Sequence, residues 1–201
     1  GLHRIMSVFK LGLTGSIGTG KTTTAALFAK HGCPVWSADD AVHRLYAVGG
    51  GGAALLAGLV PLALKDGIVD RGLLKAAIAQ DRSLLPKIEA LVHPLVAQDR
   101  AAFLALYDSG IVVLDVPLLY ETKLQSMMDA VLVVTAPPDV QRQRVLTRAT
   151  MSAQDLELIL SWQMPDQEKQ KLADYIIETT TLERAEAAVI KLIESLRLHH
   201  A

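Results

Sequence analysis

Apolar segments of strand length alternate along this chain with segments whose apolar positions repeat at helical spacing. Residues 7–15, SVFKLGLTG, are mainly apolar, and residues 21–31 carry an apolar helical face that ends at Gly32. Further strand-like segments are CPVWSADD, IVVLDVPLL, AVLVVTAP and, more weakly, ADYIIETT. Continuous apolar strands separated by helices are typical of a parallel sheet with helices on both faces. We therefore expect an α/β fold with a five-stranded parallel sheet.

The region between the second and third predicted strands departs from this pattern. From about residue 53 to about residue 108 the chain is rich in Leu and Ala, has a helical period and shows no convincing strand. We interpret it as a helical insertion into a core formed by about residues 7–48 and 109–201. Four glycines, Gly49 to Gly52, precede it and could act as a flexible connector or as a hinge.

Composition narrows the classes of function. Of the 201 residues, 51% are hydrophobic, which is enough to bury a core. The formal charge is -1, from 20 Lys and Arg against 21 Asp and Glu, so no overall basic field would attract a nucleic acid. We therefore expect no nucleic-acid partner, and any anion site must be local.

The sequence also predicts where the protein works. Cys33 is the only cysteine, so no intramolecular disulfide can form, which fits a reducing cytosol. The two longest apolar runs lie around residues 111–120 and 130–138 and have the length of a strand. The first is broken by Asp115 and the second is bounded by prolines, so neither can span a bilayer. The first residues lack the apolar core and small-residue cleavage site of a signal peptide. We expect a cytoplasmic protein with no membrane partner.

Residues 15–22, GSIGTGKT, carry the most specific chemistry. They fit G-x-x-x-x-G-K-[ST] and lie between a predicted strand and a predicted helix, the context in which this pattern binds phosphate. Glycines let successive backbone N–H groups turn inward, and the helix N-terminus adds positive charge. Lys21 would reach the β- and γ-phosphates, and the Thr22 hydroxyl would be a ligand of Mg²⁺. The alternative is an ordinary glycine-rich turn with no bound phosphate. If the loop binds ATP, the expected contacts are Gly18, Thr19, Gly20, Lys21, Thr22 and Thr23.

The rest of the sequence bears on which molecule receives the phosphate. A GTPase needs an Asn-Lys-x-Asp segment to recognise guanine, and this chain contains no Asn. Transport and mechanical ATPases usually have larger domains. A small-molecule kinase fits better, because transfer to an acceptor needs a second pocket and a mobile cover that excludes water. A nucleoside or nucleotide monophosphate kinase, and a regulatory ATP-binding protein that hydrolyses ATP slowly, remain alternatives.

Several polar residues are candidates for the acceptor side. Asp39 follows the second predicted strand and could orient an acceptor hydroxyl or cap a helix that begins at Ala41. Arg71 could cap a helix or bind an acceptor phosphate. His93, between two helical stretches, could form a structural hydrogen bond or contact the substrate. Asp115 ends an apolar strand, where it could contact Mg²⁺ through water.

Two arginines and a tyrosine also have open roles. Arg144 and Arg148 lie four residues apart on a predicted helix, so they share one face, which could be solvated or could bind phosphate. Tyr120 could place its ring against a ligand or pack half-buried. No Cys and His residues cluster at metal-ligand spacing, so a zinc site is not expected.

These segments resemble the dephospho-coenzyme A kinase family. The resemblance runs through LTGSIGTGKTT, GCPVWSADDAVH, DGIVDRGLL, LVHPLV, VPLLYETKL, QRQRVLTRAT and WQMPDQEKQKLADYII. Many kinases share the phosphate loop, whereas LVHPLV followed by VPLLYE at this separation is specific. The resemblance implies a P-loop kinase fold with a helical CoA-binding insertion and a lid at about residues 144–165. It also implies ATP- and Mg²⁺-dependent transfer of the γ-phosphate to the ribose 3′-hydroxyl of dephospho-CoA.

The matched positions imply roles for single residues. Asp39 matches the second Asp of the family's D-A-D motif and would prepare the acceptor hydroxyl, whereas Ser37 replaces the first Asp. Arg144 would contact ATP, and Arg148 would neutralise charge on the transferring phosphoryl group. The family's usual Asn is absent near Thr179. The expected substrate contacts are Asp39, Arg71, His93, Leu118, Leu119 and Glu121.

Overall fold

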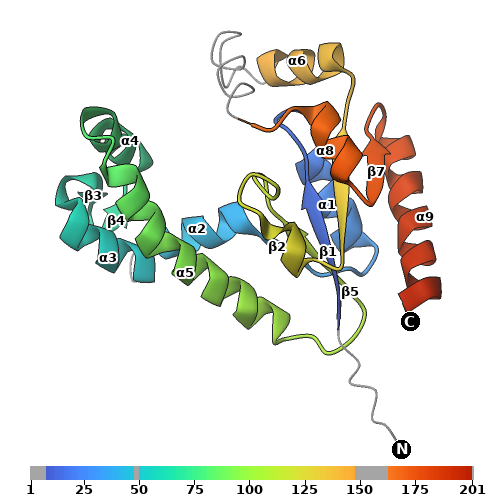
Figure 1. Cartoon of the computed structure of the whole chain (residues 1–201), viewed down its shortest axis with the longest axis horizontal. Helices are drawn as coiled ribbons and strands as arrows, with labels where there is room; N and C mark the ends of the chain where they lie inside the picture. Colours follow the sequence, from blue (N-terminus) through green and yellow to red (C-terminus); the bar gives the residue numbers. More distant parts are fainter. Residues whose placement is uncertain (1–7, 48–49, 148–162, 201) are drawn as a thin grey trace, which may run out of the picture. The chain divides into compact units, whose positions relative to one another are not determined.

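The computed structural model describes residues 8–47, 50–147 and 163–200 of the chain (Figure 1). They form two compact units, one from the residues up to Trp36 and from Tyr107 onward, the other from Ser37–Leu106. Within these described ranges, no helix combines the length and the apolar character needed to cross a membrane.

The first unit is built on a five-stranded sheet (Figure 1). Its spatial order is β2-β5-β1-β6-β7, and the strands are β1 (Phe9–Thr14), β2 (Val35–Ser37), β5 (Ile111–Asp115), β6 (Ala130–Thr135) and β7 (Tyr175–Glu178). β1 pairs in parallel with β5 and β6, and β6 pairs in parallel with β7. The predicted α/β fold with a five-stranded parallel sheet is confirmed.

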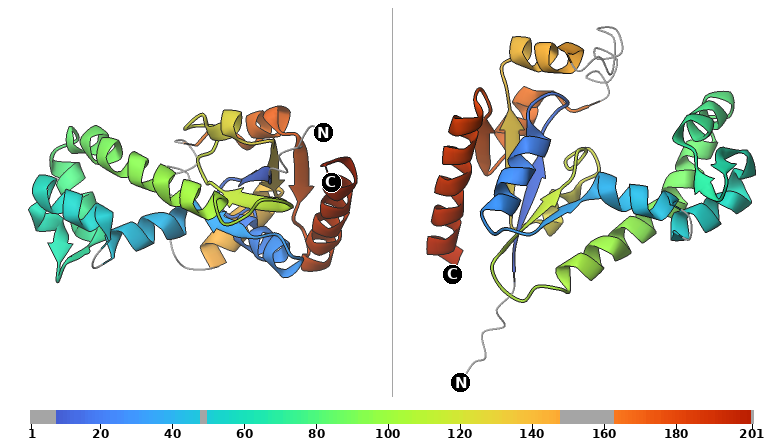
Figure 2. Two further views of the ribbon diagram at one scale, coloured as in Figure 1. Left: turned by 90° about the horizontal axis from the view of Figure 1, so that it is seen from below. Right: turned by 180° about the vertical axis from the view of Figure 1, so that it is seen from behind.

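Helices link these strands and cover the sheet. They are α1 (Lys21–Lys30), α6 (Pro138–Thr147), α8 (Asp166–Leu172) and α9 (Leu182–His200), with a 3-10 turn, η2 (Leu124–Met127). α1 and α9 cover one face, where Phe28 and Leu196 share a core with Leu13 and Leu132 (Figure 2). Every residue of β5 and β6 is buried. This explains why both strands appear in the sequence as continuous apolar runs.

The second unit is largely helical. Its elements are α2 (Ala38–Tyr46), α3 (Gly51–Leu59), the 3-10 turn η1 (Pro61–Ala63), α4 (Arg71–Gln80) and α5 (Leu84–Leu104). α2 belongs to this unit because it packs against α3 and α5. The unit has its own core, which includes Leu56, Leu74, Ile88 and Val92.

A short hairpin in this unit corrects the expectation that residues 53–108 contain no strand. β3 (Leu64–Lys65) and β4 (Ile68–Val69) pair antiparallel around Asp66 and Gly67, whose φ angles are 54° and 77°. The type I′ two-residue hairpin turn needs positive φ at both central positions and favours Asp-Gly. Strands of two residues are too short to show a periodic pattern in the sequence. The Asp-Gly pair of the turn was the signal that could have predicted this hairpin.

The helix around His93 and Pro94 is a second correction. The sequence indicates a junction between two helical stretches, but α5 continues through this point with Pro94 inside it. A proline within a helix removes a backbone hydrogen bond and costs about 3 kcal/mol. Burial of Ile88 and Val92 from the same helix in the core of the unit offsets that cost.

Candidate active site

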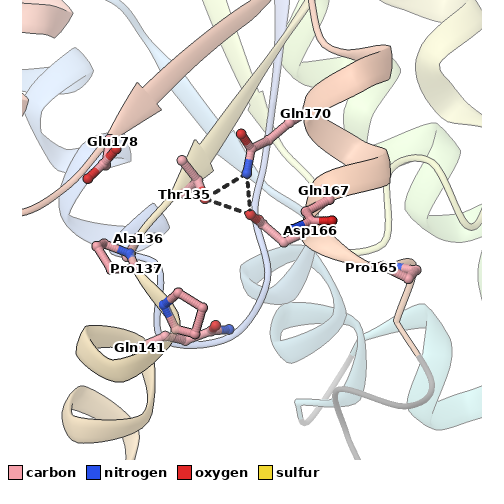
Figure 3. Close-up of a pocket in the computed structure, with 10 residues that line it drawn as sticks. Thr135, Ala136, Pro137, Gln141, Pro165, Asp166, Gln167, Gln170 and Glu178 are labelled. Carbon is pink, nitrogen blue, oxygen red and sulfur yellow. Dashed lines mark hydrogen bonds between the residues drawn. The ribbon is translucent and has the colours of Figure 1, made fainter.

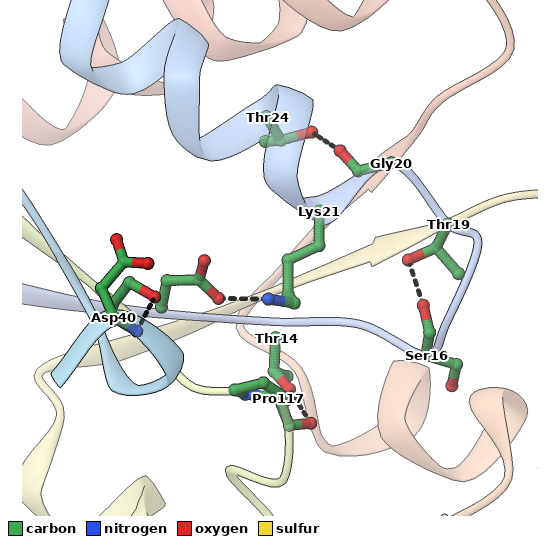
Figure 4. A network of polar contacts seen from close by, with 10 residues as sticks. Thr14, Ser16, Thr19, Gly20, Lys21, Thr24, Asp40 and Pro117 are labelled. Carbon is green, nitrogen blue, oxygen red and sulfur yellow. Dashed lines mark hydrogen bonds and ion pairs between the residues drawn. The ribbon is translucent and has the colours of Figure 1, made fainter. Parts of the chain in front are cut away.

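A glycine-rich loop joins β1 to α1 and contains the predicted phosphate-binding motif. Gly18 and Gly20 have φ angles of 78° and 89°, in the left-handed region that favours glycine. The Thr19 hydroxyl donates to the Ser16 carbonyl at 2.7 Å, and the Thr24 hydroxyl donates to the Gly20 carbonyl at 2.9 Å (Figure 4). Because the loop leads into the N-terminus of α1, its backbone amides and the helix dipole favour an anion.

The loop packs closely against its neighbours. A Cβ atom at Gly15 would lie 2.7 Å from the Val134 carbonyl oxygen of β6, so only glycine fits there. From α6, the buried Gln141 donates its side-chain N–H to the Ile17 carbonyl at 2.5 Å. Sequence reasoning missed Gln141, because a lone Gln on a helix belongs to no motif. These contacts hold the loop against β6 and α6.

Lys21, the first residue of α1, forms an ion pair with a carboxylate at the end of the adjacent strand. Its Nζ lies 2.5 Å from Oδ1 of Asp115, and the two side chains are 14% and 9% exposed. Asp115 is opposite Leu13 in the pairing of β5 with β1, which places it at the carboxyl end of the sheet. In this low-dielectric position each charge stabilises the other. The sequence did not indicate this pair.

Thr22 and Thr23 lie in the first turn of α1 and are exposed, so a ligand of the loop can reach both residues. Thr22 offers a hydroxyl oxygen and Asp115 a carboxylate oxygen, and Mg²⁺ takes donors of this kind. No group of three or more His, Cys, Asp or Glu side chains that could hold a metal ion occurs within residues 8–47, 50–147 and 163–200.

Arg144 extends from α6 toward the end of β7. Its Nη2 donates to the Thr179 carbonyl at 2.6 Å, its Nη1 donates to the Thr179 hydroxyl at 2.9 Å, and the Gly18 carbonyl lies 3.5 Å from Nη1. These contacts bring the predicted ATP residue Arg144 beside the phosphate loop. The other predicted arginine, Arg148, lies outside the described residues.

A hollow of about 320 Å³ opens at the carboxyl ends of β6 and β7 (Figure 3). Its walls include the starts of α6 and α8 and the side chain of Glu178. On one wall, the Asp166 carboxylate accepts hydrogen bonds from the Thr135 hydroxyl and from the Gln170 amide, both at 2.6 Å. Gln141 lines the hollow and also donates to the phosphate loop, so one side chain joins the two.

The segment after β5 is partly buried. Leu118 is 42% exposed, whereas Leu119 is fully buried and lies against β1, where a Cβ at Gly12 would be 2.8 Å from Leu119 Cδ1. Tyr120 is buried as well, and burial, followed by the nearby charge of Asp174, raises its pKa to about 12. The structure thus favours the packing role for Tyr120, and Leu119 has a core position.

Glu121 is tied to a fully buried lysine. Glu121 Oε2 lies 3.2 Å from Nζ of Lys169, whose side chain is 0% exposed, and it also accepts from the Met164 backbone N–H at 3.2 Å. The sequence did not single out Lys169, because a lysine within the polar segment DQEKQKL gives no signal of burial. This pair links the segment after β5 to α8.

Asp39 lies in the second unit, in the first turn of α2. This helix begins at Ala38 and not at Ala41, and the Ser37 hydroxyl caps it by accepting from the Asp40 N–H at 3.3 Å. The helix starts earlier because Ser is a strong N-cap and has the extended backbone that an N-cap needs. Asp39 is therefore not the cap of α2, and its carboxylate lies in the first turn beside that of Asp40.

Arg71 and His93 also belong to the second unit. Arg71 begins α4, but the cap is Asp70, whose carboxylate accepts from the Leu73 N–H at 2.9 Å. The Arg71 guanidinium instead lies 5.8 Å from the centroid of the Tyr46 ring, a cation–π distance. Burial raises the pKa of Tyr46, and the charge of Arg71 opposes that shift. His93 is exposed on α5.

The central strand β1 leads through the phosphate loop into α1, which begins at Lys21, and this arrangement in a parallel sheet defines the class of P-loop nucleotide-binding proteins. Solved structures share this fold. Shikimate kinase from Bacteroides thetaiotaomicron matches with a TM-score of 0.52 and 17% identity over 94% of this chain and 98% of that one. TT1252 from Thermus thermophilus matches with a TM-score of 0.85 and 30% identity over 94% of this chain and 97% of that one.

Sequence comparisons identify the family. The family model for dephospho-CoA kinase matches residues 9–183. Dephospho-CoA kinase of Cereibacter sphaeroides is 59% identical over 192 residues, which are 96% of this chain and 98% of that protein. Dephospho-CoA kinase of Jannaschia sp. is 53% identical over 189 residues, which are 94% of this chain and 97% of that protein. The chain belongs to the dephospho-CoA kinase family.

Proposed function

We propose that this protein transfers the γ-phosphate of ATP to the ribose 3′-hydroxyl of dephospho-CoA, giving CoA and ADP. The observation that carries the proposal is a phosphate loop ending in Lys21 in a chain 59% identical to a protein named dephospho-CoA kinase. The acceptor oxygen attacks the γ-phosphorus, the bond to the oxygen bridging the β- and γ-phosphates breaks, and the hydroxyl proton passes to a base.

On the ATP side, the loop and its helix bind the phosphates. Backbone N–H groups of Gly18, Thr19 and Gly20 hydrogen-bond phosphate oxygens. Lys21 leaves Asp115 and places its ammonium against the β- and γ-phosphates, where it offsets the charge that develops on the leaving ADP. The further ATP contacts are Thr22, Thr23 and Arg144, with Arg148 stabilising the transferring phosphoryl group from a lid at about residues 144–165.

The Mg²⁺ that would accompany ATP needs oxygen donors beside the phosphate loop. The exposed Thr22 and the Asp115 carboxylate offer oxygen donors that would hold it alongside phosphate oxygens. When bound, the ion neutralises phosphate charge and orients the phosphates.

On the acceptor side, Asp39 hydrogen-bonds the 3′-hydroxyl, aims it at the γ-phosphorus and accepts its proton. A helical insertion at about residues 53–108 binds the CoA moiety, with Arg71 and His93 as contacts. Leu118 and Glu121 contact the acceptor as well, and the buried Leu119 supports them from the core.

We expect this activity in the cytoplasm. The single cysteine, Cys33, is buried, and burial raises the pKa of its thiol, so the group is a poor nucleophile. A chain that uses no disulfide suits a reducing compartment.

Incubation of the protein with ATP, Mg²⁺ and one acceptor at a time tests the proposal. The acceptors are dephospho-CoA, a set of nucleoside monophosphates, and none. ADP release with dephospho-CoA alone is expected. Release with nucleoside monophosphates would instead indicate another nucleotide kinase, and release without acceptor a regulatory protein that hydrolyses ATP slowly. The Lys21→Ala protein, purified in parallel, controls for contaminating kinases.

A further inference from the structure

Thr179 directly follows β7 and is buried, with 5% of its surface exposed. Its backbone N–H donates to the Thr135 carbonyl at 2.9 Å, which extends the pairing of β7 with β6 by one residue. Side chains alternate along a strand. Accordingly, Glu178 lines the hollow described above, whereas the Thr179 hydroxyl turns to the phosphate loop.

The Thr179 hydroxyl connects three parts of the site. It donates to the Thr19 carbonyl of the phosphate loop in a short hydrogen bond, and the Thr135 carbonyl, 3.4 Å away, is a more distant acceptor. The same oxygen accepts from Arg144 Nη1 at 2.9 Å. Since a hydroxyl has one proton and two lone pairs, it can donate to the loop and accept from the arginine at the same time.

Steric contact reinforces this link. A Cβ atom at Gly20 would lie 2.8 Å from Thr179 Oγ1, so the left-handed turn at Gly20 is packed directly against the hydroxyl. The Thr179 carbonyl takes a second hydrogen bond from the Arg144 guanidinium, at 2.6 Å. Thr179 therefore contacts both the phosphate loop and the Arg144 guanidinium, and its position affects the conformation of both.

We propose that Thr179 is a positioning residue of the ATP site. Its hydroxyl orients the peptide between Thr19 and Gly20, and with it the Gly20 N–H of the phosphate loop, and it keeps Arg144 directed at the loop. This inference rests on the proposed function only in taking the loop as the ATP site. Because every contact is made with the loop, with β6 or with Arg144, the effect falls on the nucleotide and not on the acceptor.

Thr179→Val and Thr179→Ser test this role. Valine keeps the volume but leaves the Thr19 carbonyl and one guanidinium N–H without their partner, whereas serine keeps the hydroxyl. An unsatisfied buried polar group of this kind should weaken ATP binding about tenfold or more, while serine should stay within about threefold of the parent. Titration calorimetry with a non-hydrolysable ATP analogue measures this without any acceptor, and KM for dephospho-CoA should not change.

Thr180→Val is the matched control, because Thr180 is the next residue and is exposed. It should bind the analogue like the parent. The proposal is overturned if Thr179→Val binds the analogue as tightly as the parent, even with a lowered melting temperature, because the role is then structural only. The proposal is also overturned if Thr179→Val raises KM for ATP and KM for dephospho-CoA by the same factor. It is overturned as well if Thr179→Ser binds the analogue as weakly as Thr179→Val. If the parent bound ATP but phosphorylated no acceptor, the proposed function would fail and the binding comparison would still decide the role of Thr179.

Discussion

Single residues at the site differ in whether they support the fold as well as the chemistry. Lys21 is the partner of an Asp115 carboxylate that is 9% exposed, so its charge matters before ATP arrives. Asp39 is exposed in the first turn of α2, where the cap is Ser37. Replacing Lys21 should therefore affect both stability and rate, whereas replacing Asp39 should affect rate alone.

Lys21→Ala should abolish most phosphoryl transfer and also lower the melting temperature. Removing one partner of a mostly buried ion pair costs up to about 3 kcal/mol, because the other charge keeps its desolvation penalty. Adding Asp115→Asn should recover stability without recovering transfer. Calorimetric melting and a coupled ADP assay on the parent, single and double variants check this, and near-normal turnover by folded Lys21→Ala would exclude the proposed role of the loop.

Asp39→Asn should lower the transfer rate by about 10² to 10⁴, the usual contribution of a positioned acid–base group. ATP affinity and the melting temperature should barely change, since an exposed charge near a helix start contributes only about 0.3–1 kcal/mol. Asp40→Asn is the control, because it removes the same charge from the same turn. Equal activity of the two variants would remove Asp39 from the mechanism.

At the scale of elements, buried polar contacts hold loops and helices together. The pair of Lys169 with Glu121 joins α8 to the segment after β5, and Lys169 has no exposed surface. The sequence of α8, DQEKQKL, suggests a solvated helix. Burial of one of its lysines depends on the tertiary fold, which a local pattern cannot report.

Lys169→Met should destabilise the protein by up to about 3 kcal/mol, because the variant leaves the partly buried Glu121 carboxylate without its cation. The double variant Lys169→Met/Glu121→Leu should regain most of this loss, since two packed apolar side chains can replace an ion pair at little cost. Urea unfolding of the parent and of the two variants measures the difference. A double variant no more stable than Lys169→Met would show that the pair is not the source of the loss.

For the molecule as a whole, the sequence predicts more of the fold than of the site. β5 and β6 are buried on both faces, so their apolar runs identify them, and the loop motif identifies Lys21. The partners that set side-chain directions are distant in sequence: Asp115 for Lys21, Thr179 for Arg144 and Ile17 for Gln141. Spacing along the chain carries no record of such contacts. The β3–β4 hairpin and the unbroken α5 were missed because local signals were too short or were overridden by packing.

The central claim is that the phosphate passes to the ribose 3′-hydroxyl of dephospho-CoA. Phosphorus-31 NMR of a reaction with ATP, Mg²⁺ and dephospho-CoA tests it most directly, because it resolves a ribose phosphomonoester from inorganic phosphate. We predict one new phosphomonoester, coupled to the hydrogen on the ribose 3′ carbon, for each ADP formed. ADP accompanied by inorganic phosphate, or a phosphate on the 2′-hydroxyl, would contradict the claim.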